Sequence, residues 1–217
     1  MVRFEGGNRS NENVELNLIV CLTGMPGSGK STVAKFLKEY GFSLVTMGDV
    51  VREEAKRSHI ELTDTNLGNL MVKMRSDMGP GAIAYLIKGE IERIKTTLKS
   101  TNFVVDGIRS LSEVEILKTV GSVRLLSIHA STKTRFEHLK IRARDDAPLT
   151  VQDFENRDQR ELLVGISEAI ALSDEVLSNN SLTIGELKRI SIGLVAQWVK
   201  DQHSNGKKTS QAGGTQD

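Results

Sequence analysis

The sequence predicts an α/β fold in which a five-stranded parallel sheet is covered by helices on both faces. Short apolar runs alternate with segments whose apolar residues recur at helical spacing, which is typical of strand–helix–strand units. A glycine-rich segment, GMPGSGKS, lies between the first apolar run and the first helical pattern. The chain has 217 residues, of which 38% are hydrophobic and 26% charged, and this suits one substantial domain. These observations together indicate a three-layer domain built around a buried sheet.

Five apolar runs have the length and composition of buried strands. We expect these strands at Leu16–Thr23, Ser43–Thr46, Phe103–Asp106, Val123–His129 and Glu175–Ser178. Apolar spacing predicts a helix over Ser31–Tyr40 and further helices along the stripes Leu67 to Met78, Ile83 to Leu98 and Leu187 to Trp198. The same stripes place Trp198 in the core rather than against a ligand.

Composition indicates the domain boundaries, the compartment and the kinds of partner. We expect a flexible N-terminal tail over residues 1–14, a folded domain over 15–200 and a disordered C-terminal tail over 201–217, because both ends have few apolar residues to bury. Cys21 lies in an apolar run with no partner for an internal disulfide, which fits a reduced compartment. A net charge of +1 favours neither nucleic acid nor a membrane as partner. We therefore expect a cytoplasmic protein.

The glycine-rich segment fits the phosphate-binding pattern G-x-x-x-x-G-K-S/T, and it lies between a predicted strand and a predicted helix, as that pattern requires. Glycines allow a tight turn whose amide groups face phosphate oxygens, and the helix N-terminus adds partial positive charge. Lys30 would reach the β- and γ-phosphates of ATP, and Ser31 would ligate Mg²⁺. The expected triphosphate-binding residues are Gly24, Met25, Pro26, Gly27, Ser28, Gly29, Lys30, Ser31 and Thr32. The fold class is therefore a P-loop NTPase fold.

The third predicted strand ends in Asp106-Gly107-Ile108-Arg109. Asp106 would lie beside the phosphate-binding loop, where it could hold Mg²⁺ through bound water; the alternative is an ordinary Asp-Gly turn. No glutamate follows Asp106 directly to polarise a water molecule. This favours phosphoryl transfer to an acceptor over hydrolysis.

Two segments resemble motifs of adenylate kinases. The segment Thr46-Met47-Gly48-Asp49-Val50-Val51-Arg52 resembles their T-G-D-x-x-R motif, and Asp106-Gly107-Ile108-Arg109 resembles their D-G-F-P-R turn. The resemblance implies that Arg52 and Arg109 grip the phosphate of an acceptor, with acceptor-binding helices over about 47–98. Either arginine could instead form a surface ion pair.

A basic region over about 131–160 resembles the short helical lid of nucleotide kinases, whose arginines close over the triphosphate. By this resemblance Arg135 and Arg142 are catalytic candidates. The spacing before Asp145-Asp146 leaves open whether Arg142 or Arg144 takes the second lid position. Arg157 and Arg160 would either add charge to the lid or form surface pairs, as Asp153 and Glu161 lie one helical turn from Arg157.

From about Leu18 to Ile190 the chain resembles an uncharacterised archaeal family of adenylate-kinase-related P-loop proteins. The segments that carry this resemblance are GMPGSGKST, MGDVVREEA, DGIRS, HASTKTRFE and RARDD, in that order. A further segment, Asp174 to Asn179, resembles an ending shared with dephospho-coenzyme A kinases. That resemblance makes Asn179 a candidate for the adenine pocket, with a turn residue as the alternative.

Three functions remain open on the sequence. The first is an ATP-dependent kinase of nucleoside monophosphate type, in which Lys30 and the lid arginines neutralise the transferred group and no base is needed. The second is a kinase for a hydroxyl acceptor, such as dephospho-coenzyme A or a nucleoside, with Asp49 as catalytic base; the alternative for Asp49 is a helix N-cap. The third is a non-catalytic ATP-dependent regulatory protein.

Overall fold

The computed structural model describes residues 17–98, 102–142 and 150–211. The strands are β1 (Leu18–Thr23), β2 (Ser43–Thr46), β3 (Phe103–Asp106), β4 (Ser122–His129) and β5 (Glu175–Ser178). The helices are α1 (Lys30–Glu39), α2 (Met47–Arg57), α3 (Asp64–Met78), α4 (Ala82–Leu98), α5 (Leu111–Lys118), α6 (Thr132–Arg142), α7 (Val151–Leu163), α8 (Ile166–Ala171) and α9 (Ile184–Gln211). All five strands lie where the apolar runs predicted them.

The strands form one five-stranded sheet in the order β2-β3-β1-β4-β5, and every neighbouring pair is parallel. The strand before the glycine-rich loop, β1, is therefore central, with β3 on one side and β4 on the other. Because all strands run the same way, their carboxyl ends lie along one edge, where open α/β sheets bind ligands. The predicted α/β class is confirmed.

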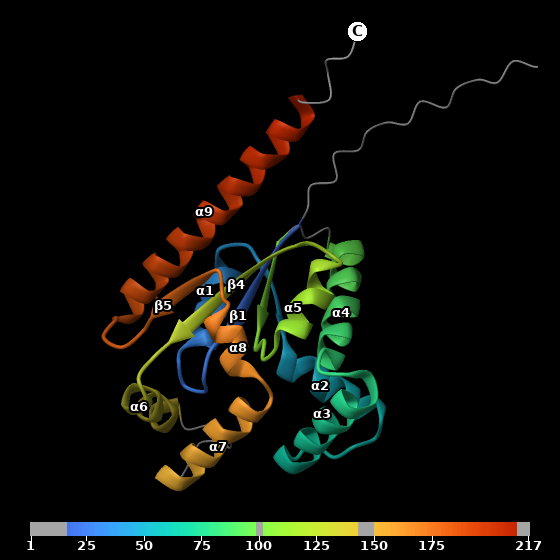
Figure 1. Ribbon diagram of the computed structural model, residues 1–217, viewed down its shortest axis with the longest axis vertical. Coiled ribbons are helices and arrows are strands. Elements are labelled where there is room, and N and C mark those ends of the chain that lie inside the picture. The colour runs from blue at the N-terminus through green and yellow to red at the C-terminus, as the bar shows by residue number, and fades with distance from the viewer. Residues whose placement is uncertain (1–16, 99–101, 143–149, 212–217) are drawn as a thin grey trace, which may run out of the picture.

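Successive side chains of each strand point to opposite faces of the sheet, and this divides the core into two layers, one on each face. Ile19 and Cys21 of β1 pack against helices α2, α4, α5 and α8, whereas Leu18 and Val20 pack against α1 and α9. Figure 1 shows α4 and α5 on one side of the sheet and α1 and α9 on the other. The predicted helices on both faces are thus present.

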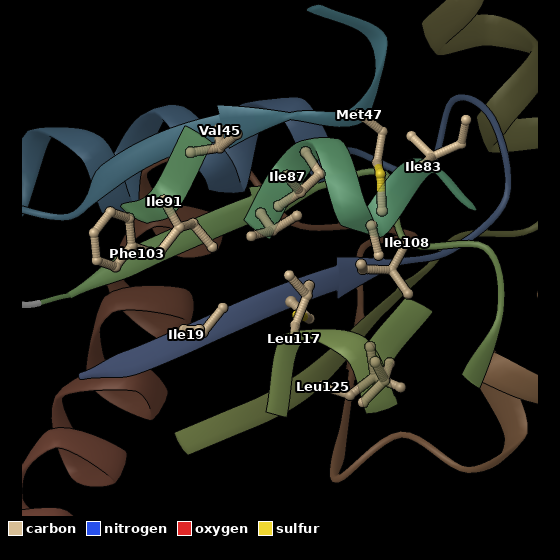
Figure 2. Close-up of a cluster of buried hydrophobic side chains, with 14 of the residues drawn as sticks. Ile19, Val45, Met47, Ile83, Ile87, Ile91, Phe103, Ile108, Leu117 and Leu125 are labelled. Carbon is tan, nitrogen blue, oxygen red and sulfur yellow. The ribbon is translucent and has the colours of Figure 1, made fainter. Parts of the chain in front are cut away.

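Helix α4 supplies much of the first core layer. Its apolar stripe buries Ile83, Ile87 and Ile91, and Figure 2 shows these side chains lying among strand residues such as Val45 and Phe103. Met47, the first residue of α2, lies in the same cluster. This packing fixes α2 at the carboxyl end of β2.

Helix α9 extends beyond the predicted C-terminal boundary. The sequence predicted a tail from residue 201, but the helix continues past Asp201 to Gln211. Val195 and Trp198 anchor the helix to the sheet, and once its first turns are fixed each further residue adds a hydrogen bond at little cost.

The predicted N-terminal tail lies outside the described residues. Within the described part of the chain, none of the helices has both the length and the apolar character needed to cross a membrane.

Replacing Ile87 with alanine tests the assignment of the α4 stripe to the core. Ile87 is fully buried, so Ile87→Ala should lower the free energy of unfolding by about 2–5 kcal/mol. Ile141→Ala is a matched control, since Ile141 is 82% exposed on α6 and its truncation should change stability by less than about 0.5 kcal/mol. Urea unfolding followed by circular dichroism measures both. Equal effects would contradict the assignment.

Candidate functional site

The glycine-rich loop connects the end of β1 to α1, and its backbone requires glycine at three positions. Gly24, Gly27 and Gly29 have φ values of +136°, +82° and +107°, which L side chains rarely adopt. Space is restricted as well, because a Cβ at Gly24 would lie 2.2 Å from the carbonyl oxygen of Ile128. Gly29 ends the loop as the N-cap of α1. The loop therefore presents a bare backbone at the N-terminus of a helix.

Lys30 folds back over the first part of the loop. Its Nζ donates to the carbonyl oxygens of Gly24 at 2.6 Å and Met25 at 3.1 Å. Burial lowers the pKa of Lys30 to about 8, against opposing contributions that include the charge of Asp106. A buried ammonium group whose hydrogen bonds go to carbonyl oxygens is stabilised by an incoming anion. This fits the predicted contact of Lys30 with phosphate.

Side chains from three other positions hold the second part of the loop from outside. Three consecutive carbonyl oxygens are contacted: Pro26 by Arg135 Nη1 at 3.1 Å, Gly27 by His138 Nδ1 at 2.9 Å and Ser28 by Asn179 Nδ2 at 2.9 Å. The His138 contact requires the tautomer protonated on Nδ1. Because a planar trans peptide directs its N–H opposite to its C=O, these contacts turn loop amides toward the inside. The loop residues therefore fit a bound triphosphate.

Arg135, predicted as a lid arginine over the triphosphate, is observed in contact with the phosphate-binding loop and with α7. It is 5% exposed, and its guanidinium binds Asp158 of α7 with two bonds of 2.8 and 2.6 Å while it lies over the Phe154 ring. Arg135 lies on α6, the helix that follows β4, and it contacts the loop on the side of its carbonyl groups. In this arrangement Arg135 supports the loop and joins α6 to α7.

Asn179, a candidate for the adenine pocket by resemblance, contacts the phosphate-binding loop. Its backbone N–H donates to the carbonyl of His129, and its buried side chain donates to Ser28. A Cβ at Gly29 would lie 2.5 Å from Asn179 Nδ2, so the two residues are closely packed. Asn179 thus buttresses the loop at the end of β5.

The candidate magnesium residues come from neighbouring elements. Ser31 and Thr32 lie in the first turn of α1 and are half-buried. Asp106 ends β3 in register with Leu22 of β1, and the turn after it is fixed because the Gly107 and Ile108 amides both donate to the carbonyl of Leu22. Hydroxyl and carboxylate oxygens are suitable ligands for Mg²⁺ or for its water shell. Ser31 and Asp106 therefore fit the ion.

Arg109 forms a largely buried pair with Glu161 of α7. Its Nε lies 2.7 Å from Glu161 Oε2 and its Nη2 lies 3.2 Å from Oε1, while Nη1 donates to the carbonyl of Gly107. Burial alone would lower the pKa of Arg109, but the charge and hydrogen bonds of Glu161 raise it above its usual value. The sequence had offered an ion pair as the alternative for Arg109, and this pair is observed, although it is buried.

Arg52 and Asp49 form a pair on the exposed side of α2. Arg52 Nη1 lies 2.7 Å from Asp49 Oδ1, with side chains 51% and 69% exposed. The N-cap of α2 is Thr46, whose hydroxyl accepts from the Asp49 amide and donates to the Asp49 carboxylate. Asp49 itself is therefore not the N-cap. Exposed ion pairs of this kind contribute little to the stability of the fold, so a ligand can replace one partner at small cost.

Some site residues were missed from the sequence, and others lie outside the described part. Asp158, Glu161 and His138 were not assigned to the site, and Glu161 was considered only as a surface partner of Arg157. One available signal was that Asp158 and Glu161 lie one turn apart on a helix and so share a face. The Arg142 side chain and the segment containing Arg144, Asp145 and Asp146 lie outside the described residues.

A glycine-rich loop after the central strand, a lysine opening the next helix and an aspartate on the adjacent strand define a P-loop protein of kinase-like architecture. A family model described as an AAA domain matches residues 23–155. The UPF0200 protein TK1334 of Thermococcus kodakarensis is 41% identical over 167 residues, which are 75% of this chain and 89% of that protein. The UPF0200 protein MJ1399 of Methanocaldococcus jannaschii is 44% identical over 163 residues, 75% and 81% of the two chains. The chain belongs to the UPF0200 family.

Solved structures share the fold at low sequence identity. TT1252 from Thermus thermophilus has a TM-score of 0.59 and 17% identity, with 84% of this chain and 98% of that chain covered. Shikimate kinase from Acinetobacter baumannii, in complex with shikimate, has a TM-score of 0.50 and 12% identity, with 86% and 94% covered. At these identities the likeness is one of fold.

Alanine at Gly27 tests the backbone requirement of the loop. Gly27→Ala would force a side chain into a left-handed conformation with its Cβ 2.5 Å from the Arg135 carbonyl oxygen. We expect a loss of about 1–3 kcal/mol in the free energy of unfolding. Gly193→Ala is the control, because the space around Gly193 in α9 is open and alanine should stabilise the helix by up to about 1 kcal/mol. Thermal unfolding compares the two, and a neutral Gly27→Ala would contradict the described loop geometry.

Proposed function

We propose that this protein is an ATP- and Mg²⁺-dependent phosphotransferase of nucleoside monophosphate kinase type, which transfers the γ-phosphate to a nucleotide or a related small molecule. The observation that carries the proposal is the placement of three charged residues at one edge of the sheet: Lys30 opens the helix after the central strand β1, and Asp106 and Arg109 lie at and just after the end of the neighbouring strand β3. Helices α2, α3 and α4 are inserted between β2 and β3 in the chain, and Figure 1 shows α2 and α3 at this end of the sheet. Such an arrangement has a donor site and an adjacent region for a second ligand.

In the proposed reaction the loop amides and Lys30 bind the β- and γ-phosphates. Mg²⁺, held through Ser31 and Asp106, would neutralise charge on the phosphate oxygens when bound. Arg52 and Arg109 would orient the acceptor, and Lys30 would stabilise the charge on the transferred group. Catalysis then consists of positioning and charge neutralisation, and an acceptor that is already an anionic phosphate needs no base.

A hydroxyl acceptor is the second candidate, favoured by one observation. Asp49 is 69% exposed, and its carboxylate is held by Thr46 and Arg52 at the start of α2. A carboxylate fixed at the carboxyl end of a strand has the placement of a base for a substrate hydroxyl. In this version Asp49 takes the hydroxyl proton as the phosphoryl group is transferred.

An acceptor panel tests the proposed activity. Purified protein with Mg-ATP should form ADP when one of several nucleoside monophosphates, nucleosides or dephospho-coenzyme A is added, and phosphorylated acceptor should appear in equal amount. Lys30→Ala should lower kcat/KM by about 100-fold or more, because it removes the charge that stabilises the transferred group. ADP formation that is independent of every acceptor would count against a kinase. A regulatory ATP-binding protein would bind Mg-ATP without forming either product.

Two substitutions on α2 separate the acceptor classes. Arg52→Ala should raise the acceptor KM about 10- to 100-fold while ATP affinity stays unchanged, because it removes a charge-assisted contact to the acceptor. Asp49→Asn should lower kcat strongly only if the acceptor is a hydroxyl. Glu53→Gln, an exposed carboxylate on the same helix, is the matched control for Asp49→Asn. A selective loss of ATP affinity in Arg52→Ala would contradict the assignment of Arg52 to the acceptor.

A further inference from the structure

Helix α7 carries two carboxylates on one face, and each holds an arginine from another element. Asp158 binds Arg135 through bonds of 2.8 and 2.6 Å, and Glu161 binds Arg109 through bonds of 2.7 and 3.2 Å. All four side chains are mostly buried. Paired bonds between a guanidinium and a carboxylate are strong and geometrically specific. The two pairs therefore fix α7 in place.

The two arginines serve different halves of the site. Arg135 contacts the Pro26 carbonyl of the phosphate-binding loop, on the donor side. Arg109 follows the Asp106 turn at the end of β3, on the side assigned to the acceptor. Figure 1 shows α6 and α7 beyond the carboxyl end of the sheet. One helix thus contacts both halves.

We propose that Glu161 occupies the place of the acceptor's anionic group on Arg109, and that an acceptor phosphate binds by exchanging with Glu161 for the guanidinium. This inference rests on the proposed kinase function. The Nε and Nη2 edge of Arg109, which Glu161 now fills, also matches two oxygens of a phosphate. A carboxylate and a phosphate cannot use this edge together. Glu161 is therefore an internal competitor of the acceptor.

Arg109 is held in position independently of Glu161. Its backbone N–H donates to Glu113 Oε2 at 2.7 Å, and its Nη1 donates to the Gly107 carbonyl at 3.0 Å. Glu113 is buried and is also paired with Arg75 of α3. When Glu161 leaves, the guanidinium still faces the site with its binding edge available.

The surrounding charge keeps Glu161 ionised in its pair with Arg109. Burial acts to raise the pKa of Glu161, but Arg109, Lys30 and Arg157 together lower it below its usual value. The exchange is then between a singly charged carboxylate and a phosphate monoester, which carries up to two charges at neutral pH. This favours acceptors with a phosphate group over neutral acceptors.

The exchange can be measured without turnover, with inorganic phosphate as the probe. The protein is first saturated with Mg-ADP to fill the phosphate-binding loop, and phosphate is then titrated by calorimetry. Glu161→Gln removes the competing charge and should bind phosphate about tenfold more tightly than the unmodified protein, a change of about 1.4 kcal/mol. Glu155→Gln, an exposed carboxylate on the same helix, should leave phosphate affinity unchanged.

Two further variants test whether the gain belongs to Arg109. Glu161→Asp keeps the charge but shortens the side chain, so it should also bind phosphate more tightly, and it serves if Glu161→Gln does not fold. Adding Arg109→Lys to either variant should abolish the gain, since lysine has no planar edge for two oxygens. The inference is wrong if folded Glu161 variants bind phosphate no better than the unmodified protein, or if the gain persists without Arg109. Failure of Mg-ADP to bind in the first step would instead count against the proposed function.

Discussion

The backbone of the loop between Gly24 and Gly29 is the constraint on which the rest of the site depends. Its amide groups bind an anion only while its carbonyl groups point elsewhere, and the three left-handed glycines provide that turn. Lys30 holds the first carbonyls, while Arg135, His138 and Asn179 hold the next ones from β4–α6 and from the end of β5. The elements around the loop are thus arranged to fix its peptide planes.

Charge balance explains why α7 packs at the carboxyl edge of the sheet, beside the glycine-rich loop. Arg135 and Arg109 are both removed from water, and a buried arginine without a partner would be strongly destabilising. Asp158 and Glu161 satisfy them from one helix face. Helix α7 is therefore held by paired charges as much as by the apolar contact of Phe154. Because the same arginines lie beside the two predicted ligand sites, we expect ligand binding to be coupled to the position of α7.

Much of the fold followed from local patterns. The five strands and the stripe of α4 appear as apolar runs or apolar spacing in contiguous residues. Helix α9 continues past the boundary expected at residue 201, because its continuation depends on earlier turns anchored by Trp198 and not on the composition of the segment itself. The roles predicted for Arg52 and Arg109 remain predictions, since both are observed paired with carboxylates.

The sequence by itself determined the α/β architecture and the phosphate-binding loop, because strand burial, helix spacing and glycine conformation are properties of neighbouring residues. The tertiary structure decided which side chains surround that loop. Arg135 meets Pro26 across 109 residues, Asn179 meets Ser28 across 151, and Glu161 meets Arg109 across 52. Such pairs form only when the strand order brings their elements to one edge, so no local pattern records them. For this reason Glu161 became part of the site only in three dimensions.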